Sequence, residues 1–210
     1  MKKIFLTFIL ISSNIFSQAL IPNPPEVSAS SYLLLDAKTL TVISSSKADQ
    51  STGLASITKI MTTYVVADQI SKGFISLDTL VDISVTCWKM EGSKMFIREG
   101  TEVSVSDLLK GIIIQSGNDA SCALAEKIAG SQSAFADLMN NYAEQLDLLD
   151  TNFVNPTGLP DVNHYSTAND IAKLSIRLIE DFPNSYDLFR EKEFTFNNIR
   201  QLNRNSLLWQ

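Results

Sequence analysis

Residues 55–61 read Ala-Ser-Ile-Thr-Lys-Ile-Met, and this stretch decides how the rest of the chain is interpreted. Ser56 and Lys59 are three residues apart, and on a helix such residues share a face with Cβ atoms roughly 5–6 Å apart. The apolar residues that follow recur at helical spacing up to Lys72-Gly73, a basic residue and a glycine that favour a helix end. We therefore expect a helix from Ser56 on which Lys59 reaches the serine hydroxyl and activates it as a nucleophile.

Spacing alone does not establish such a pair, because Ser44 and Lys47 are also three residues apart. Ser44 lies in a run of Thr, Val, Ile and Ser that predicts a strand, where an odd separation places side chains on opposite faces. A surface serine and lysine on an amphipathic helix is the alternative interpretation of Ser56 and Lys59, and a second motif is needed to decide.

The composition predicts one globular domain. A chain of 210 residues that is 45% hydrophobic can bury a sizeable core. The net charge of −6 and the lack of a basic run argue against nucleic acid as a partner. The single histidine and two separated cysteines match no metal-binding pattern, so we expect neither a metal nor a cofactor.

The N-terminus has the three parts of a secretory signal: two lysines, a short apolar run and small residues at the cut. We expect residues 1–19 to be a signal peptide, residues 20–210 to form the exported domain, and the protein to be periplasmic. An oxidising compartment permits a disulfide between Cys87 and Cys122. We nevertheless expect free cysteines, because Cys122 lies among alanines, where a thiol packs as a small apolar residue.

The pattern of turns and apolar runs predicts an α+β domain. A hairpin is expected from residue 31 to 45, and another strand from Glu193 to Asn197. After the first helix, further helices are expected at 107–114 behind a Ser106 cap, at 118–129, from Ser131 or Ser133 to Leu146, and at 171–179 behind a capping box from Thr167. We expect the early and late strands to join one antiparallel sheet.

A second motif, Ser116-Gly117-Asn118, follows at the junction of two predicted helices. Glycine lets the backbone approach a ligand, the serine hydroxyl can pass a proton, and the asparagine amide can hold a carbonyl. Taken alone, the same residues are equally consistent with a helix N-cap.

Together, Ser-x-x-Lys and Ser-x-Asn form the first two parts of the signature of penicillin-binding proteins and serine β-lactamases. The chain resembles the low-molecular-mass D-alanyl-D-alanine carboxypeptidases of bacterial cell walls, and the resemblance covers essentially everything after the signal peptide. The blocks that resemble the family, in family order, are 56–62, 92–96, 116–120, 155–159, 164–168 and 201–205.

The resemblance implies a fold with an antiparallel sheet flanked by helices and a helical subdomain. It implies that Ser56 is the acyl-ester nucleophile, Lys59 the base, Ser116 a proton shuttle and Asn118 the substrate-binding amide. The implied partners are peptidoglycan stem peptides ending in D-Ala-D-Ala, with β-lactams as inhibitors. A lysine acts as a base only when neutral, so the pKa of Lys59 must be lowered by burial or by a neighbouring cation.

The third part of the family signature, Lys-Thr-Gly, does not occur in the sequence. We interpret the chain as truncated before this motif, without the late sheet strands, the small C-terminal β-domain and the membrane anchor of the family. We therefore expect the 210-residue chain alone to be inactive and only marginally folded, with a membrane surface reached only through that anchor.

Two alternatives stay open: a DD-endopeptidase of the same fold, and a pseudoenzyme that binds peptidoglycan or penicillin without turnover. A class A β-lactamase is disfavoured because Pro183 stands where the Glu-x-x-Leu-Asn motif has leucine. A Ser-His-Asp hydrolase is disfavoured because the only histidine, His164, lies in a polar loop, where we expect a surface or loop-bonding role.

Overall fold

The computed structural model of the chain describes residues 27–210, so the predicted signal peptide lies outside the described residues. The longer helices are α1 (Lys59–Ser71), α3 (Val105–Gln115), α4 (Asn118–Ala129), α5 (Gln132–Gln145) and α6 (Ala168–Asp181). Single turns are formed by η1 (Ala55–Thr58), α2 (Val85–Trp88), α7 (Pro183–Tyr186), η2 (Asp187–Arg190) and η3 (Ser206–Trp209). Among the described residues, none of the helices is both long enough and apolar enough to cross a bilayer.

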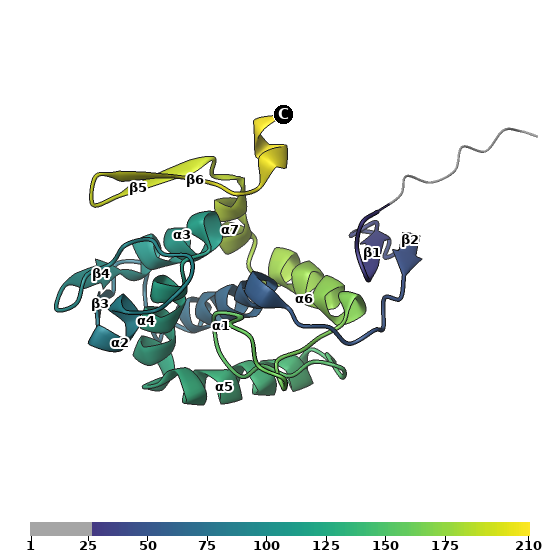
Figure 1. Cartoon of the computed structure of the whole chain (residues 1–210), viewed down its shortest axis with the longest axis horizontal. Coiled ribbons are helices and arrows are strands. Elements are labelled where there is room, and N and C mark those ends of the chain that lie inside the picture. Colours follow the sequence, from purple (N-terminus) through teal and green to yellow (C-terminus); the bar gives the residue numbers. More distant parts are fainter. Residues whose placement is uncertain (1–26) are drawn as a thin grey trace, which may run out of the picture.

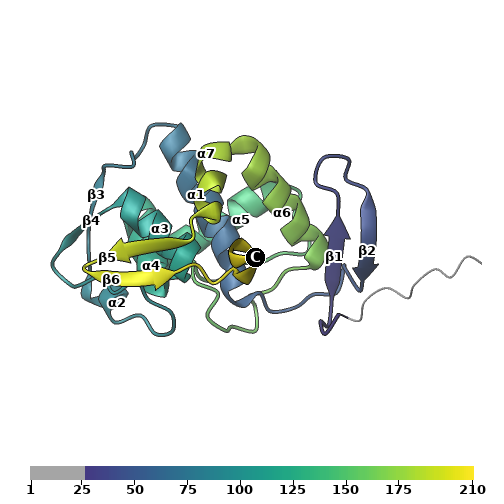
Figure 2. The same cartoon turned by 90° about the horizontal axis from the view of Figure 1, so that it is seen from above.

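Helix α1 runs through the centre of the molecule, and α3, α4, α5 and α6 surround it (Figures 1 and 2). Met61 and Val65 pack against α5 and α6, where they meet Phe135 and Leu174. Val66 faces the other way, into the core formed by α3 and α4. A helix that is buried on several faces is fixed by its surroundings, so the serine and lysine at its start have a rigid support.

Most predicted helix ends agree with the structure. The Ser131 and Thr167 hydroxyls cap α5 and α6 by accepting the N–H groups of Ala134 and Asp170. Two starts differ. The helix expected from Ser56 opens as the 3-10 turn η1, and α1 itself begins only at Lys59. Helix α3 has Ser104 as its cap, and the predicted cap Ser106 lies inside the helix. The Ser104 hydroxyl reaches the N–H of Asp107 at 3.1 Å, so the helix begins two residues earlier than predicted.

The strands form three separate antiparallel ribbons among residues 27–210: β1 (Tyr32–Leu35) with β2 (Val42–Ser46), β3 (Leu80–Asp82) with β4 (Glu102–Ser104), and β5 (Glu193–Phe196) with β6 (Ile199–Leu202). The predicted hairpin and the late strand are present, and the α+β class is confirmed. The early and late strands do not join one sheet as predicted. Ribbon β1–β2 lies beside α6 while β5–β6 lies on α3, so their edges are apart (Figure 2).

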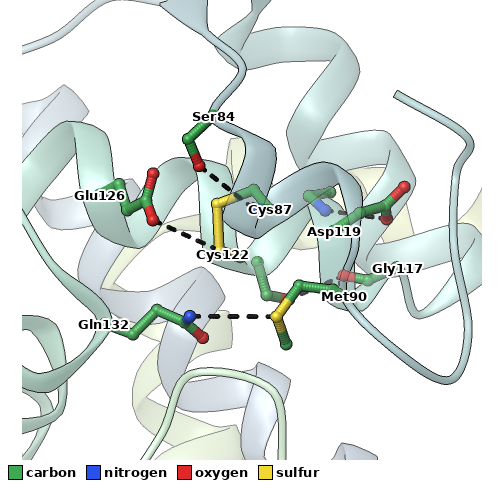
Figure 3. Close-up of a disulfide and its surroundings, with 10 residues drawn as sticks. Ser84, Cys87, Met90, Gly117, Asp119, Cys122, Glu126 and Gln132 are labelled. Carbon is green, nitrogen blue, oxygen red and sulfur yellow. Dashed lines mark hydrogen bonds between the residues drawn. A yellow bond between two sulfur atoms is a disulfide. The ribbon is translucent and has the colours of Figure 1, made fainter. Parts of the chain in front are cut away.

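Cys87 and Cys122 form a disulfide, so the prediction of two free cysteines is wrong (Figure 3). The alanines around Cys122 belong to its own helix, α4, whereas its partner Cys87 comes from α2. The Ser84 hydroxyl caps the single turn α2 at the N–H of Cys87, which places this residue fully buried against α4. The bridge therefore ties the start of the 88–97 segment to α4.

Candidate active site

The predicted pair Ser56 and Lys59 meets at the start of the central helix. Ser56 lies in η1, Lys59 is the first residue of α1, and the Lys59 Nζ lies 3.2 Å from the Ser56 Oγ. The serine is exposed, whereas Lys59 is only 5% exposed. A hydroxyl open to solvent and held by a buried amine is the arrangement that the first motif predicts.

Three acceptors surround the Lys59 ammonium. Besides Ser56, its Nζ donates to the Oδ1 of Asn118 and to the backbone carbonyl of Thr157, both at 2.7 Å. An ammonium has three N–H donors, so this set satisfies it completely. Burial, with a smaller contribution from the positive charge of Arg204, lowers the pKa of Lys59 to about 8, and the negative charge of Asp119 partly opposes this shift. The neutral amine that a base requires is thus accessible near neutral pH.

Ser116 follows α3 and shares a small cavity with the serine–lysine pair. Ser56, Lys59 and Ser116 line this cavity, which has a volume of about 110 Å³. Ser116 ends α3 in the left-handed conformation, with φ 61°, which is uncommon for a residue with a side chain. Its hydroxyl is buried and has no hydrogen-bond partner among the described residues. A strained residue with a free buried hydroxyl facing a cavity is typical of a functional position.

Asn118, the first residue of α4, links the lysine to the neighbouring 88–97 segment. Its Oδ1 accepts the Lys59 ammonium, and its Nδ2 donates to the backbone carbonyl of Glu91 at 2.7 Å. Both ends of the amide are therefore fixed, and the predicted substrate-binding residue is brought together with Ser56, Lys59 and Ser116.

The loop at 155–159 supports the site in a way that the sequence did not reveal. Thr157 supplies a backbone carbonyl to Lys59, and a backbone group leaves no side-chain motif. Gly158 passes so close to the turn before Ser56 that a Cβ atom there would lie 1.7 Å from the Ala55 oxygen. The signal that could have found this contact is Gly158 itself, since a glycine in a turn often marks close backbone approach.

His164 is buried, at 3% exposure, and bonds the loop to η1, so the loop-bonding expectation is confirmed and the surface one is not. Its Nδ1 accepts the N–H of Val154, so the proton resides on Nε2, which donates to the Thr58 hydroxyl at 2.7 Å. Burial lowers the pKa of His164 below its usual value, an effect that Asp161 partly opposes. The neutral ring therefore holds the turn that carries Ser56.

Arg204 is a charged group whose influence on the site the sequence did not predict, although it lies in the 201–205 block. It follows β6, 145 positions after Lys59 in the chain. Its charge nevertheless reaches the lysine and lowers its pKa. Only the fold brings these two residues together, because no local periodicity relates them.

Three possible metal ligands, Cys87, Cys122 and Glu126, cluster beside α4. The two sulfur atoms are joined in the disulfide, so neither cysteine can supply the thiolate that a metal would bind. The cluster therefore does not fit a metal site, and it lies in a different place from the Ser56 cavity.

Comparison with known proteins agrees with this geometry. A family model described as D-alanyl-D-alanine carboxypeptidase matches residues 18–210. The chain is 46% identical over 191 residues to D-alanyl-D-alanine carboxypeptidase DacC of Escherichia coli K12, covering 88% of this chain and 48% of that protein. It is 43% identical over 189 residues to DacA of Haemophilus influenzae, covering 89% and 48%. The crystal structure of penicillin binding protein 5 from Haemophilus influenzae superposes with a TM-score of 0.86 at 43% identity, over 90% of this chain and 56% of that one. The chain thus spans about half the length of the curated relatives that it matches.

Proposed function

The chain belongs to the D-alanyl-D-alanine carboxypeptidase family, and we propose that the protein removes the terminal D-alanine from peptidoglycan stem peptides. The observation that carries the proposal is the Lys59 amine, which is buried against the Ser56 hydroxyl and has a pKa lowered to about 8. This arrangement supplies a nucleophile and its base within one helical turn.

The proposed reaction begins when neutral Lys59 accepts the proton of the Ser56 hydroxyl. The Ser56 oxygen attacks the carbonyl carbon of the penultimate D-alanine, and the Ser56 N–H at the helix start stabilises the negative charge that forms on the carbonyl oxygen. The C–N bond to the terminal D-alanine then breaks, and the leaving amine takes a proton passed through Ser116. Water hydrolyses the remaining ester and regenerates both the hydroxyl and the neutral lysine.

Two features of the site support these roles. Asn118 can orient the substrate carbonyl because its amide is already fixed between Lys59 and Glu91. Ser116 can exchange a proton with the leaving group because its buried hydroxyl is not committed to another partner among the described residues. A β-lactam would acylate Ser56 by the same attack, with its ring amide in place of the peptide bond. Export to the periplasm, where the substrate lies, belongs to the same proposal.

The test is to incubate the native protein that carries this sequence with a peptide ending in D-Ala-D-Ala and, separately, with a cross-linked stem-peptide dimer. We expect release of free D-alanine from the first and labelling of Ser56 by fluorescent penicillin, located by peptide mapping. Cleavage of the dimer without D-alanine release would favour the endopeptidase. Penicillin labelling without turnover of either substrate would favour the pseudoenzyme.

A further inference from the structure

The 88–97 segment crosses the beginning of α4 and is attached to it at several points. The backbone N–H of Asn118 donates to the Ser93 carbonyl and its side chain donates to the Glu91 carbonyl, both at 2.7 Å. The carboxylate of the next residue, Asp119, accepts hydrogen bonds from backbone N–H groups. Its Oδ1 accepts Met95 at 3.0 Å and Ala120 at 2.9 Å, while its Oδ2 accepts Phe96 at 3.0 Å and Ile97 at 3.3 Å.

Asp119 is a buried carboxylate, 1% exposed, and no salt bridge includes it within residues 27–210. Four N–H donors and the N-terminal end of a helix stabilise its negative charge instead. Replacing one oxygen with an NH₂ group would set that group against backbone donors and leave some of them without an acceptor. The carboxylate is therefore specific to this contact with the 95–97 backbone.

The position of the Asn118 amide depends on this contact. Glu91 and Gly92 lie directly against the amide: Glu91 accepts its Nδ2, and a Cβ atom on Gly92 would lie 2.7 Å from the same nitrogen. A small displacement of the segment would therefore move the amide, whose other end contacts Lys59.

We propose that Asp119 is a positioning residue for the reaction of Ser56. Its carboxylate holds the 95–97 backbone against α4 and thereby fixes the position of Glu91 and Gly92. These two residues in turn keep the Asn118 amide against Lys59. This inference rests on the proposed function. It extends that proposal by giving a role to Asp119, which contacts neither Ser56 nor the cavity that Ser56 lines. The disulfide ties the other end of the same segment to α4 (Figure 3).

The negative charge of Asp119 provides a measurement that distinguishes a positioning role from a merely stabilising one. The charged groups that act on Lys59 are Arg204, which lowers its pKa, and Asp119, which raises it. Removing the Asp119 charge should lower the pKa of Lys59 further, so the acid limb of the acylation rate against pH should move to lower pH. At the same time the plateau rate should fall, because the amide is misplaced.

The experiment compares Asp119→Asn with Glu126→Gln, the same chemical change two helical turns further along α4, in the native protein. We expect Asp119→Asn to slow penicillin acylation at saturation about 10- to 100-fold, with the half-saturating concentration little changed. The pKa of Lys59, followed by NMR at its ¹³Cε, should fall. Glu126→Gln should keep the plateau rate within about twofold of the wild type and should leave the Lys59 pKa unchanged.

A wild-type plateau rate in Asp119→Asn would overturn the proposal, as would a Lys59 pKa that does not fall. Should this variant fail to fold, Gly92→Ala decides, because its new methyl group pushes on the Asn118 amide without changing a charge. It should lower the plateau rate by a similar factor, and a wild-type rate would overturn the proposal. Absence of penicillin labelling in the wild type would contradict the proposed function instead, and the NMR measurement would still decide the role of Asp119.

Discussion

Ser56–Lys59 and Ser44–Lys47 have the same spacing and opposite surroundings. Ser56 and Lys59 follow one helical path, and the lysine is buried against the serine hydroxyl. Ser44 lies within strand β2 and pairs with the Tyr32 hydroxyl at 3.3 Å, while the exposed Lys47 follows the strand in the left-handed conformation. The comparison teaches that the spacing defines only a possibility. Helical geometry places the lysine against the serine, and burial together with the charge of Arg204 makes it a usable base.

The largest effect should come from removing the Ser56 hydroxyl, with removal of the Ser44 hydroxyl as the matched control. Ser56→Ala should abolish penicillin labelling, because the atom that forms the ester is gone, and Ser44→Ala should leave it unchanged. Labelling of intact protein, read by mass spectrometry, measures both variants. A label that persists in Ser56→Ala, or disappears in Ser44→Ala, would contradict the assignment of the nucleophile.

The second largest effect is expected when the two lysines, Lys59 and Lys47, are replaced and the acylation rates are compared. Lys59→Ala should slow acylation by about 10²–10⁴-fold, the usual contribution of a general base, whereas Lys47→Ala should change the rate less than twofold. Single-turnover labelling over time gives the rates, and circular dichroism checks that both variants are folded. Equal rates for Lys59→Ala and the wild type would assign the base to another group.

The pH dependence of the rate sharpens the contrast. With a pKa of about 8, Lys59 is mostly protonated at pH 6, and its neutral fraction increases about tenfold per pH unit until it levels off above pH 8. The acylation rate should follow this curve. The unfolding free energy should also rise with pH above 8, because the unfolded lysine, with a pKa near 10.5, still binds a proton that the folded one has lost. A rate that is flat or falls between pH 6 and 8 would contradict lysine as the base.

The sequence predicted the local part of this site and missed the distant part. Helix periodicity and caps located α1, α4, α5 and α6, and short motifs gave Ser56, Lys59, Ser116 and Asn118, because each depends on near neighbours in the chain. The Thr157 carbonyl, which accepts the lysine, and Arg204, which lowers its pKa, come from about 100 residues or more away. Both lie in segments that resemble the family, 155–159 and 201–205, but no local pattern gave either of them a role at the lysine.

Errors in the framework have the same origin. The disulfide joins residues 35 positions apart, and only the packing of α2 on α4 places their sulfurs together. The pairing of β3 with β4 was missed because each strand has three residues, too few to show an alternating pattern. The separation of β1–β2 from β5–β6 depends on which helix each ribbon covers, and this is a tertiary property that strand patterns do not contain.

The smallest predicted effect distinguishes the two serine segments by their stability in acid. His164 holds the turn of Ser56 through Thr58, and burial lowers its pKa below the usual 6.5. The unfolded chain therefore binds a proton at a higher pH than the folded one, so the unfolding free energy should decrease as the pH falls below about 6.5.

Protonation of His164 would also place a second proton on Nδ1, which now accepts the N–H of Val154, so the loop and η1 should loosen together. Hydrogen exchange followed residue by residue, and corrected for the intrinsic pH dependence of amide exchange, should show protection around Thr58 that falls from pH 7 to pH 5 more than protection in the hairpin at Ser44. In His164→Gln this pH dependence should disappear, at a cost of about 1 kcal/mol for the lost hydrogen bond. Equal acid sensitivity of the two segments, or its persistence in His164→Gln, would show that another group controls the stability of the turn.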